Sequence, residues 1–572
     1  MAGPHPTAFA RVGADLLAVL ALIAVTMAVF VSTLGYDWVD LDDNENFLGN
    51  PHYRGLGLAQ LRWMVTGVRM GHWTPVTWLT HGLDYVLWGM NPAGYHLGNV
   101  LLHAVNAALV FLVARRLLGA AMPASGAMAL RIGALAAALL FALHPLRAES
   151  VAWITERRDV LAGSFYLLTI LAWLRAGATR DRERRRWYLL SLVLFVFGLL
   201  SKSMVISLPL VLLVLDVYPL RRLDVGAWRT PAARRVLLEK APYLALAVAM
   251  VVITSLTFRS HMRVTALETH PPAARVAMVA YSLAFFPWKT AVPLDLRPMY
   301  PLPARVSLLD APFLPAGLAV AGVTLVLVAV RRRWPAGLAV WVAYAVMLAP
   351  VSGLVHAGPQ LVADRFGYLP SLGFCLLFGA GVAAAARRPS LARLVPVAAA
   401  VWLVCLATLT WSQLQIWRDT NTLFTYMLEL EPDCAWCHAQ YGSTLGNRGH
   451  LDAALPHLIR AAELRPESFN NHANVGLAFL RVGRAAAAVP YLKMAVTLKP
   501  DYLDAVTNLG LALVAVDRAA DALPYLERAA AARPGAPGPR LGLVQAYTAL
   551  GRPADAEEHR RVLERLQAAP SR

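Results

Sequence analysis

Five acidic residues lie close together in the segment DWVDLDDNENF, at Asp37, Asp40, Asp42, Asp43 and Glu45. Neighbouring carboxylates repel one another, so one of them can have a pKa near neutrality and accept a proton from a reacting hydroxyl. The same oxygen atoms suit a divalent cation, with Asp42, Asp43 and Glu45 as its ligands. A solvated acidic loop explains this composition equally well, and the residues alone leave all three interpretations open.

A second charged segment, HPLRAESVAWITERRDVL, lies between two apolar runs. Charges beside a bilayer are costly unless they are paired or functional. Arginine suits a phosphate ligand, because its planar guanidinium donates two parallel hydrogen bonds. Snorkelling toward water explains one or two such residues but not seven. The seven are His144, Arg147, Glu149, Glu156, Arg157, Arg158 and Asp159.

Two shorter segments add further charged residues. Lys202 lies in LLSKSM, and His356, Asp364 and Arg365 lie in or just before ADRFGYLP. A lysine or arginine at either place can neutralise a leaving phosphate group. Each residue is a weak signal by itself, and the prediction depends on whether the chain brings them to one side of a membrane.

The composition indicates a polytopic membrane protein. Of 572 residues 58% are hydrophobic, and apolar runs of about 20 residues recur. The net charge of +18 resides almost wholly before residue 412, because residues 412–572 carry 17 basic and 16 acidic residues. The excess of basic residues falls in short clusters between apolar runs, which is the positive-inside pattern. Nucleic-acid binding is thereby excluded as the reason for the charge.

The basic clusters predict eleven membrane spans in an all-α membrane domain of residues 1–411. With the N-terminus cytoplasmic, this odd number places the C-terminal region on the outer side of the membrane. The membrane is predicted to be the inner (plasma) membrane. Residues 276–294 are apolar, but they contain Pro287 and Lys289, so we expect a re-entrant or interfacial element there. The first run is predicted to be a retained span rather than a cleaved signal. The predicted spans are 14–35, 97–118, 131–146, 160–176, 187–202, 204–220, 241–258, 312–330, 336–355, 368–386 and 394–411.

This threading leaves four outer regions, and almost every candidate residue falls in one of them. They are 36–96, 144–159, 259–311 and 356–367.

Residues 432–572 are predicted to form tetratricopeptide (TPR) repeats, joined to the membrane domain by a linker, 412–431. Prolines recur every 34 residues, and Gly442, Gly476 and Gly510 recur in the same phase. A period of 34 with small residues at helix-packing positions is typical of a TPR α-solenoid, whose concave surface binds partners. The units begin near Pro432, Pro466, Pro500 and Pro534.

The sequence CAWCH, residues 434–438, matches a haem-attachment pattern. However, His438 stands one repeat before His472, so the helix repeat already explains this histidine. Haem is therefore disfavoured, and Cys434 and Cys437 are expected to be structural or a redox-labile thiol pair. Cys375 and Cys405 are predicted to be small buried hydrophobic residues.

Taken together, these motifs resemble the transmembrane-and-TPR O-mannosyltransferase family of GT-C glycosyltransferases. The resemblance rests on the DD after the first run, on HPLRAESVAWITERRDVL, LLSKSM, LDVYPL and ADRFGYLP, and on the TPR repeats. It implies transfer of mannose from a polyprenyl-phosphate donor to Ser/Thr hydroxyls of exported proteins, with the TPR repeats recruiting the acceptor. The Ala- and Arg-rich composition looks bacterial, so the sugar and the acceptor stay open.

The resemblance also implies roles for individual residues. The acidic motif of the family falls on Asp42 and Asp43, one of which would take the acceptor proton in a single inverting displacement. The leaving phosphate would be held by some of Arg147, Arg158, Lys202 and Arg365. A divalent metal stays an open possibility. The predicted donor site as a whole comprises His144, Arg147, Glu149, Arg158, Asp159, Lys202 and Arg365.

Two other functions compete with the transferase. A non-catalytic membrane scaffold, with TPR repeats assembling an envelope or secretion complex, needs no charged cluster on one face. A transporter would show paired Gly/Pro-interrupted helices at the middle of the membrane, and the sequence shows no such pair.

Overall fold

The computed structural model describes residues 8–261, 271–303, 305–354 and 358–568. His356 lies outside these described residues. The chain divides into two compact units, Met1–Leu423 and Phe424–Arg572, which are described separately. The division falls inside the predicted linker, where α16 runs on to Gln415 and a further helix, α17 (Thr420–Leu430), begins.

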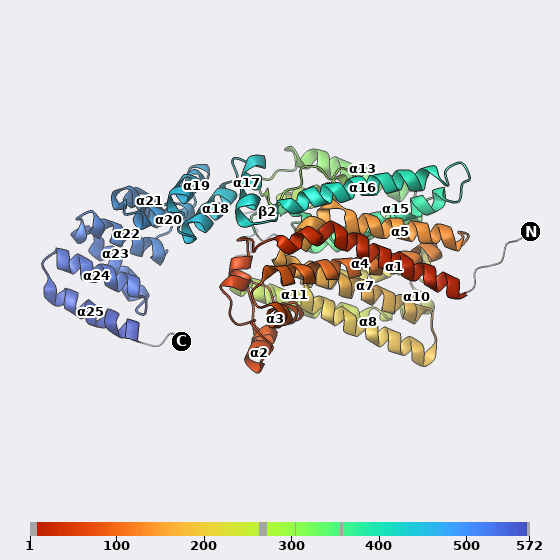
Figure 1. The fold of residues 1–572 in the computed structure, drawn as a ribbon, viewed down its shortest axis with the longest axis horizontal. Helices are drawn as coiled ribbons and strands as arrows, with labels where there is room; N and C mark the ends of the chain where they lie inside the picture. Colours follow the sequence, from red (N-terminus) through yellow and green to blue (C-terminus); the bar gives the residue numbers. More distant parts are fainter. Residues whose placement is uncertain (1–7, 262–270, 304, 355–357, 569–572) are drawn as a thin grey trace, which may run out of the picture. The chain divides into compact units, whose positions relative to one another are not determined.

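The first unit is a bundle of long apolar helices, and each of the eleven predicted spans overlaps one of them (Figure 1). These are α1 (Ala8–Phe30), α4 (Pro92–Ala121), α5 (Ala127–Leu143), α7 (Arg157–Gly177), α8 (Asp181–Ser201), α9 (Leu208–Val217), α11 (Ala241–His261), α13 (Phe313–Ala329), α14 (Pro335–Leu348), α15 (Leu372–Ala385) and α16 (Leu394–Gln415).

By length and composition, five helical segments among the described residues can cross a membrane. They are Gly13–Gly35, Pro92–Ala121, Ile154–Gly177, Pro231–Thr257 and Leu394–Gln415. A sixth is Ala127–Leu143 with Pro145–Ala152, a pair bent by 57°. The chain is thus a multi-pass membrane protein with five or six candidate spans, fewer than the eleven predicted.

Shorter elements connect the long helices. On the way to α4 they are η1 (Val31–Gly35), η2 (Asn44–Leu48), α2 (Leu58–Thr66) and α3 (Pro75–Trp88). Between α5 and α7 come η3 (Pro145–Arg147), α6 (Ala148–Ala152) and η4 (Ile154–Glu156). The rest are η5 (Ser203–Ser207), η6 (Val225–Ala227), α10 (Pro231–Leu238), α12 (Pro272–Ala291), η7 (Ala349–Val351) and η8 (Asp364–Gly367), with a two-stranded antiparallel pair, β1 (Tyr300–Pro301) and β2 (Gln360–Val362).

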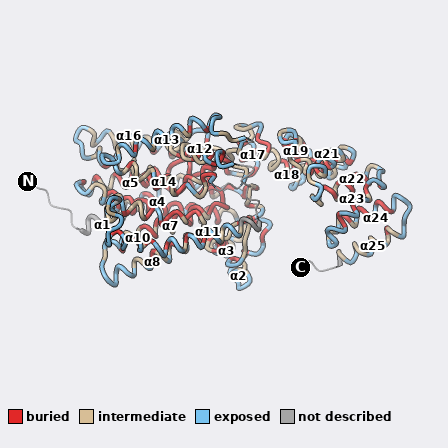
Figure 2. The backbone as a smooth tube through the Cα atoms, turned by 180° about the vertical axis from the view of Figure 1, so that it is seen from behind, coloured by how far each residue is buried: buried red, intermediate tan, exposed pale blue. Residues whose placement is uncertain are grey.

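The centre of this bundle is formed by α4, α5 and α7, where buried residues concentrate (Figure 2). Asn106 of α4 donates to the carbonyl of Val160, at 2.7 Å, and to the hydroxyl of Tyr368, at 2.9 Å. The helices α5 and α15 cross closely, since a Cβ on Gly133 would lie 2.4 Å from the carbonyl oxygen of Gly379. These contacts tie Tyr368 and α15 to α4 and α5, which precede the HPLRAES motif, and tie α4 to α7, which follows it.

The segment predicted to be re-entrant forms the helix α12, which contains Pro287. Phe286 is fully buried, and the hydroxyl of Ser282 donates to the carbonyl of Ser352. The hydroxyl of Tyr344 in α14 donates to the carbonyl of Leu283 at 3.0 Å. One face of α12 therefore packs on protein, and its relation to a membrane stays a prediction.

The second unit consists of helix pairs that repeat every 34 residues. They are α18 (Ala435–Asn447) with α19 (Leu451–Leu464), α20 (Phe469–Arg481) with α21 (Ala485–Leu498), α22 (Leu503–Ala515) with α23 (Ala519–Ala532), and α24 (Pro537–Ala549) with α25 (Pro553–Ala568). The predicted small residues at the packing positions, Ala454, Ala488, Ala522 and Ala556, are all buried. This arrangement confirms the predicted TPR solenoid.

The cysteine pair lies at the N-terminal end of α18, the first helix of the first repeat. Cys434 and Cys437 form a disulfide, so neither sulfur is a free thiol. The ring Nε2 of His438 is hydrogen-bonded to the carbonyl of Pro432 at 3.0 Å, and His472 makes the same bond to Pro466 at 2.9 Å. The histidine of CAWCH therefore has the place in the repeat that the sequence predicted. Elsewhere Cys375 is buried as expected, whereas the prediction for Cys405 was wrong, because its side chain is exposed on α16.

Gly476→Val should destabilise the second unit by about 1–3 kcal/mol, because a Cβ there would lie 2.4 Å from Cγ of Leu492. Gly483 is the matched control, since it has φ +74° and open space around it, so that Gly483→Asn should leave stability nearly unchanged. Thermal unfolding and limited proteolysis of the full chain would compare the two variants. Equal effects would contradict the packing described.

Candidate active site

Four segments that lie far apart in the sequence meet at one end of the first unit. They are the loop around Asp43, the stretch from α6 to the start of α7, Lys202 after α8, and η8 with Arg365. Thr155 bonds Asp43, and Glu156 binds both Lys202 and Arg365. The resulting cluster contains most of the charged residues predicted to do chemistry.

Glu156 is the centre of this cluster. Its side chain has no exposed surface, yet three cations contact it. Arg158 donates Nη2 at 2.7 Å and Nε at 3.2 Å, Lys202 donates Nζ at 2.9 Å, and Nε of Arg365 lies 3.3 Å away. A buried carboxylate is stable only when it is paired in this way. Glu156 therefore holds three positive side chains within one small volume.

Two more carboxylates complete the ion pairs. Asp159 accepts from Nζ of Lys202 at 2.6 Å. Glu149 accepts from the backbone N–H of Arg365 at 2.8 Å and also from its guanidinium. Because α6, η4 and α7 supply these carboxylates within eleven residues, the positions of Lys202 and Arg365 are set by one continuous stretch of chain.

The three cations remain partly accessible. Arg158 and Lys202 each expose 16% of the side chain and Arg365 exposes 14%, while Glu156 exposes 0%. Among the described residues, Nη1 of Arg158 and Nη2 of Arg365 have no acceptor, and Lys202 uses two of its three N–H groups. Donors left over on the open side of paired cations are suited to an anionic ligand such as a phosphate.

Both carboxylate oxygens of Asp43 accept hydrogen bonds from protein. Its Oδ2 accepts from the N–H of Val39 at 3.0 Å, and its Oδ1 accepts from Thr155 through the hydroxyl, at 2.6 Å, and the N–H, at 3.2 Å. Burial raises the pKa of Asp43 to about 7, although these donors act in the opposite direction. The carboxyl group thereby attaches the first loop to the residue directly before Glu156.

Asp42 is placed differently. Its side chain is half-buried, and burial raises its pKa, while the positive charges of Arg158 and Arg365 oppose the rise. Asp42 is therefore the carboxylate of the pair that lies in the field of the cations and remains open to a ligand. A carboxylate with a raised pKa is a better proton acceptor.

The first loop is held by an aromatic core. Trp38, Phe47, Tyr53, Trp78 and Tyr95 are buried against one another. These side chains come from both sides of Asp42 and Asp43 in the sequence, so the loop is a folded layer rather than a solvated acidic segment.

Glu45 does not join Asp42 and Asp43. It is largely exposed, and its carboxylate pairs with Arg69 at 3.3 Å. Among the residues that the structure describes, no three His, Cys, Asp or Glu side chains lie close enough to hold a metal. The three ligands predicted for a divalent cation are thus not assembled in this arrangement.

His144 and Arg147 lie outside the charged cluster. His144 caps η3 by accepting from the N–H of Leu146 at 3.2 Å, and its other nitrogen bonds the carbonyl of Thr290. Arg147 donates to the carbonyls of Phe141, Gly367 and Tyr368, each at 3.0 Å, and to the hydroxyl of Ser371. Its guanidinium thus joins α5 to the segment after η8, and it has no contact with Glu156.

Arg157 is a second arginine used within the fold. It pairs with Asp84 at 2.6 Å and donates to the carbonyl of Tyr95 at 2.6 Å and to the side chain of Asn99. Of the three arginines in this motif, only Arg158 is directed to Glu156.

Two residues of this region, His72 and Glu156, are not singled out by the sequence pattern. His72 follows a tight turn, Arg69 to His72, and burial with the nearby charges of Arg158 and Lys202 lowers its pKa to about 3. Burial and these positive charges thus favour the neutral form of the His72 imidazole. The sequence GHWTP around His72 contains no charged residue that would mark it as a site. Glu156 was only one acidic residue among several in its segment.

Asp364 was considered in the sequence but not assigned a role. Its side chain is buried and accepts from the hydroxyl of Tyr300 at 2.9 Å. Burial and the neighbouring Glu149 raise the pKa of Asp364 well above its ordinary value. The pair connects β1 to η8 and so supports Arg365.

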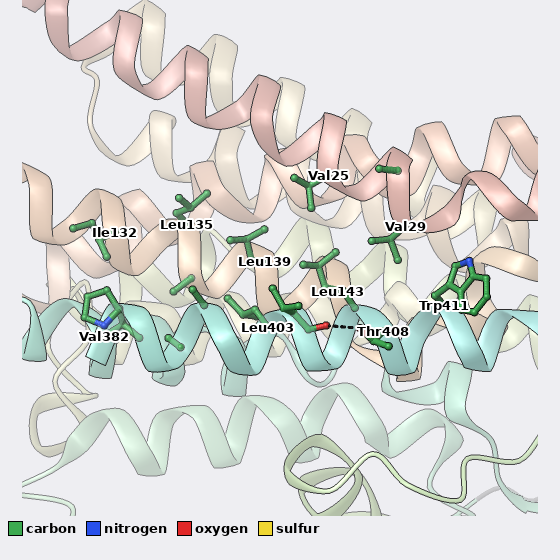
Figure 3. Close-up of a pocket in the computed structure, with 17 residues that line it drawn as sticks. Val25, Val29, Ile132, Leu135, Leu139, Leu143, Val382, Leu403, Thr408 and Trp411 are labelled. Atoms are coloured by element: carbon green, nitrogen blue, oxygen red, sulfur yellow. Dashed lines mark hydrogen bonds between the residues drawn. The ribbon is translucent and has the colours of Figure 1, made fainter. Parts of the chain in front are cut away.

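A hydrophobic cavity lies apart from the charged cluster. It has a volume of about 710 Å³ and contains none of the charged residues above. Figure 3 shows its apolar walls, which come from α1, α5, α15 and α16 and include Val25, Leu139 and Leu403. In a membrane-spanning bundle such a cavity is simply suited to hydrocarbon.

Glu156→Gln should destabilise the protein by about 3–5 kcal/mol, because Arg158, Lys202 and Arg365 would lose the buried carboxylate that they share. The comparison is Glu183→Gln, which breaks only an exposed pair with Arg175 and should have little effect. Thermal unfolding of the full chain in detergent measures both. A Glu156→Gln protein as stable as wild type would contradict the central role of this carboxylate.

The sequence is similar to proteins of known family, in the repeats and in longer alignments. The tetratricopeptide repeat family matches residues 513–563. Over 203 residues the chain is 35% identical to "Protein O-mannosyl-transferase Tmtc1" of Drosophila melanogaster, covering 34% of this chain and 22% of that protein. Over 434 residues it is 27% identical to "Protein O-mannosyl-transferase TMTC4" of Mus musculus, covering 67% of this chain and 57% of that protein.

The matched regions span less than two thirds of these curated relatives. Among solved structures, "YrrB: a TPR protein with an unusual peptide-binding site" is 18% identical, with 31% of this chain and 87% of that chain covered and a TM-score of 0.25. The chain is a distant homologue of the TMTC protein O-mannosyl-transferases that carries TPR repeats.

Proposed function

We propose that this protein transfers a sugar, mannose in the first instance, from a polyprenyl-phosphate donor to Ser/Thr hydroxyls of exported proteins. The observation that carries the proposal is the set of partly exposed cations, Arg158, Lys202 and Arg365, gathered on buried Glu156. Asp42 is half-buried and lies within the electrostatic influence of Arg158 and Arg365. A phosphate leaving group needs positive charge, and an attacking hydroxyl needs a base.

The reaction is a single displacement at the anomeric carbon. The acceptor oxygen forms its bond to this carbon as the bond from the carbon to the phosphate oxygen breaks. The hydroxyl proton passes to Asp42, and the electron pair leaves with the lipid phosphate. Arg158, Lys202 and Arg365 stabilise the charge that develops on that phosphate.

The remaining predicted residues have supporting roles in this proposal. Asp43 positions the first loop through Thr155, and Glu149 and Asp159 orient Arg365 and Lys202. His144 and Arg147 position η3 and η8 rather than touching the donor, because their polar atoms contact protein carbonyls.

The membrane arrangement is part of the proposal. A GT-C-type bundle of eleven spans, with the N-terminus cytoplasmic, puts the charged cluster and the TPR repeats on the outer side of the inner membrane, where α12 serves as an interfacial helix. The disulfide Cys434–Cys437 supports this side, because disulfides persist in oxidising compartments. The TPR repeats then recruit the acceptor protein.

The test is transfer of labelled mannose from polyprenyl-phosphate-mannose to a Thr-containing peptide by purified protein. Asp42→Asn should lower the rate by about 10²–10⁴-fold, as expected for loss of a general base. Lys202→Met should lower it through weaker stabilisation of the leaving phosphate. Asp43→Asn should act through the fold, since an amide cannot accept from both Val39 and Thr155.

The matched control is Asp310→Asn, which changes an exposed carboxylate outside the cluster and should leave the rate unchanged. Transfer by Asp42→Asn at the wild-type rate would refute the assignment of the base. A wild-type protein that transfers no sugar from any polyprenyl-phosphate donor would leave a non-catalytic TPR scaffold as the better account.

A further inference from the structure

Two histidine side chains meet between the helices of the first repeat. His438 lies in the first turn of α18, and His457 lies in the middle of α19. Their Nδ1 atoms are 2.9 Å apart, and their ring centroids are 5.1 Å apart. Two ring nitrogens at this distance share one hydrogen, so one imidazole donates and the other accepts. Both side chains are only half-buried, so the pair can be reached from solvent.

A backbone carbonyl determines which nitrogen of His438 is the acceptor. The Nε2 atom of His438 lies 3.0 Å from the carbonyl oxygen of Pro432. Because a carbonyl oxygen can only accept, Nε2 carries the hydrogen of the neutral ring, and Nδ1 directs a lone pair toward His457. Metal-binding histidines are typically held in this way, with the second ring nitrogen donating to a carbonyl or carboxylate. His438 therefore has the orientation and the tautomer of a metal ligand.

His457 can supply a second nitrogen. Burial and the neighbouring His438 lower the pKa of His457, which favours its neutral form. The ring of Tyr441 packs against His457, with centroids 4.9 Å apart, and so restricts its orientation. In the hydrogen-bonded pair the Nδ1–H of His457 donates to His438. When this proton moves to Nε2 of the same ring, both Nδ1 atoms direct a lone pair toward the space between them.

The separation of the two nitrogens fits a tetrahedral metal ion. Bonds from Zn²⁺ to nitrogen of about 2.0–2.1 Å, at a tetrahedral angle, place two nitrogens about 3.3 Å apart. A small rotation of either ring opens the observed 2.9 Å to this distance. Cys434 and Cys437 form a disulfide, so the site offers imidazole nitrogen and no thiolate. Imidazole suits Zn²⁺, Cu²⁺ and Ni²⁺, whereas Mg²⁺ and Ca²⁺ prefer oxygen ligands.

The other repeats show that a helix pair of this kind packs without two histidines. The place of His457 is taken by Tyr491 and Tyr525 in the next two repeats. In the last repeat His559 faces Arg540, whose Nη1 lies 3.0 Å from Nδ1 of the histidine. An arginine is always charged and has no lone pair to offer, so that pair cannot bind a metal ion. Of the four repeats, the first alone has histidine at both positions.

We propose that His438 and His457 bind a divalent transition-metal ion of the Zn²⁺ class in the first TPR repeat. Water completes the coordination of the ion, because no group of three His, Cys, Asp or Glu side chains is assembled among the described residues. Binding is therefore weaker than at a structural site with four protein ligands. The bound ion joins α18 to α19 and stabilises the folded repeat.

This inference is independent of the proposed sugar transfer, because it rests on one helix pair of the second unit and is measured by binding alone. The experiment titrates Zn²⁺ into the oxidised full chain in detergent at neutral pH, with isothermal titration calorimetry as the readout. The protein carries no histidine tag, since a tag would bind the same ion.

His457→Tyr is the main variant, because tyrosine stands at this place in two other repeats and should preserve the packing. It should bind Zn²⁺ at least about tenfold more weakly, since even the loss of an outer-shell partner of a metal ligand costs this much. His438→Gln should weaken binding in the same way. Thermal unfolding without metal checks that both variants are folded.

His450→Gln is the matched control, since it changes an exposed histidine of the same repeat outside the pair. It should bind Zn²⁺ as the wild type does. No binding by the wild type, or equal binding by the wild type, His457→Tyr and His438→Gln, would overturn the inference. Binding that requires reduction of the disulfide would also overturn it, because the ligands would then be the cysteine thiolates.

Discussion

The buried carboxylate of Glu156 is the interaction on which the site depends. Three cations would repel one another if they were brought together without it, and a buried carboxylate would be equally unstable without them. Because the cations come from α7, from the end of α8 and from η8, one ion cluster fixes three parts of the bundle. The positive charge needed for phosphate chemistry is therefore assembled by folding itself.

Arginine has two distinct uses in this unit. Arg147 and Arg157 are almost fully buried, and their guanidinium N–H groups donate hydrogen bonds to carbonyls and side chains of neighbouring segments. Arg158 and Arg365 keep part of their guanidinium surface exposed. The buried arginines fix the positions of the helices, and the partly exposed arginines present positive charge to a ligand. Asp43 and Asp42 divide in the same way, one tied to Thr155 and the other left open.

The sequence predicted the helices well, because apolar runs and a period of 34 residues depend on local order. It also predicted charged segments that the fold brings together, since Glu156 contacts both Lys202 and Arg365. It could not tell Arg147 from Arg158, since the difference lies in which atoms each side chain meets after folding. Nor could it identify His72 or the hub role of Glu156, because their partners lie far away along the chain. The candidate metal ligands Asp42, Asp43 and Glu45 lie within four residues of one another in the sequence, yet Glu45 turns toward Arg69.

The most direct test of this account is an experimental structure of the protein with polyprenyl phosphate, the product that the reaction would leave bound. The account predicts that the phosphate contacts Arg158, Lys202 and Arg365 while Glu156 stays behind them, with Asp42 facing the position of the sugar. A phosphate bound to Arg147 or His144, or anywhere away from the three cations, would contradict it.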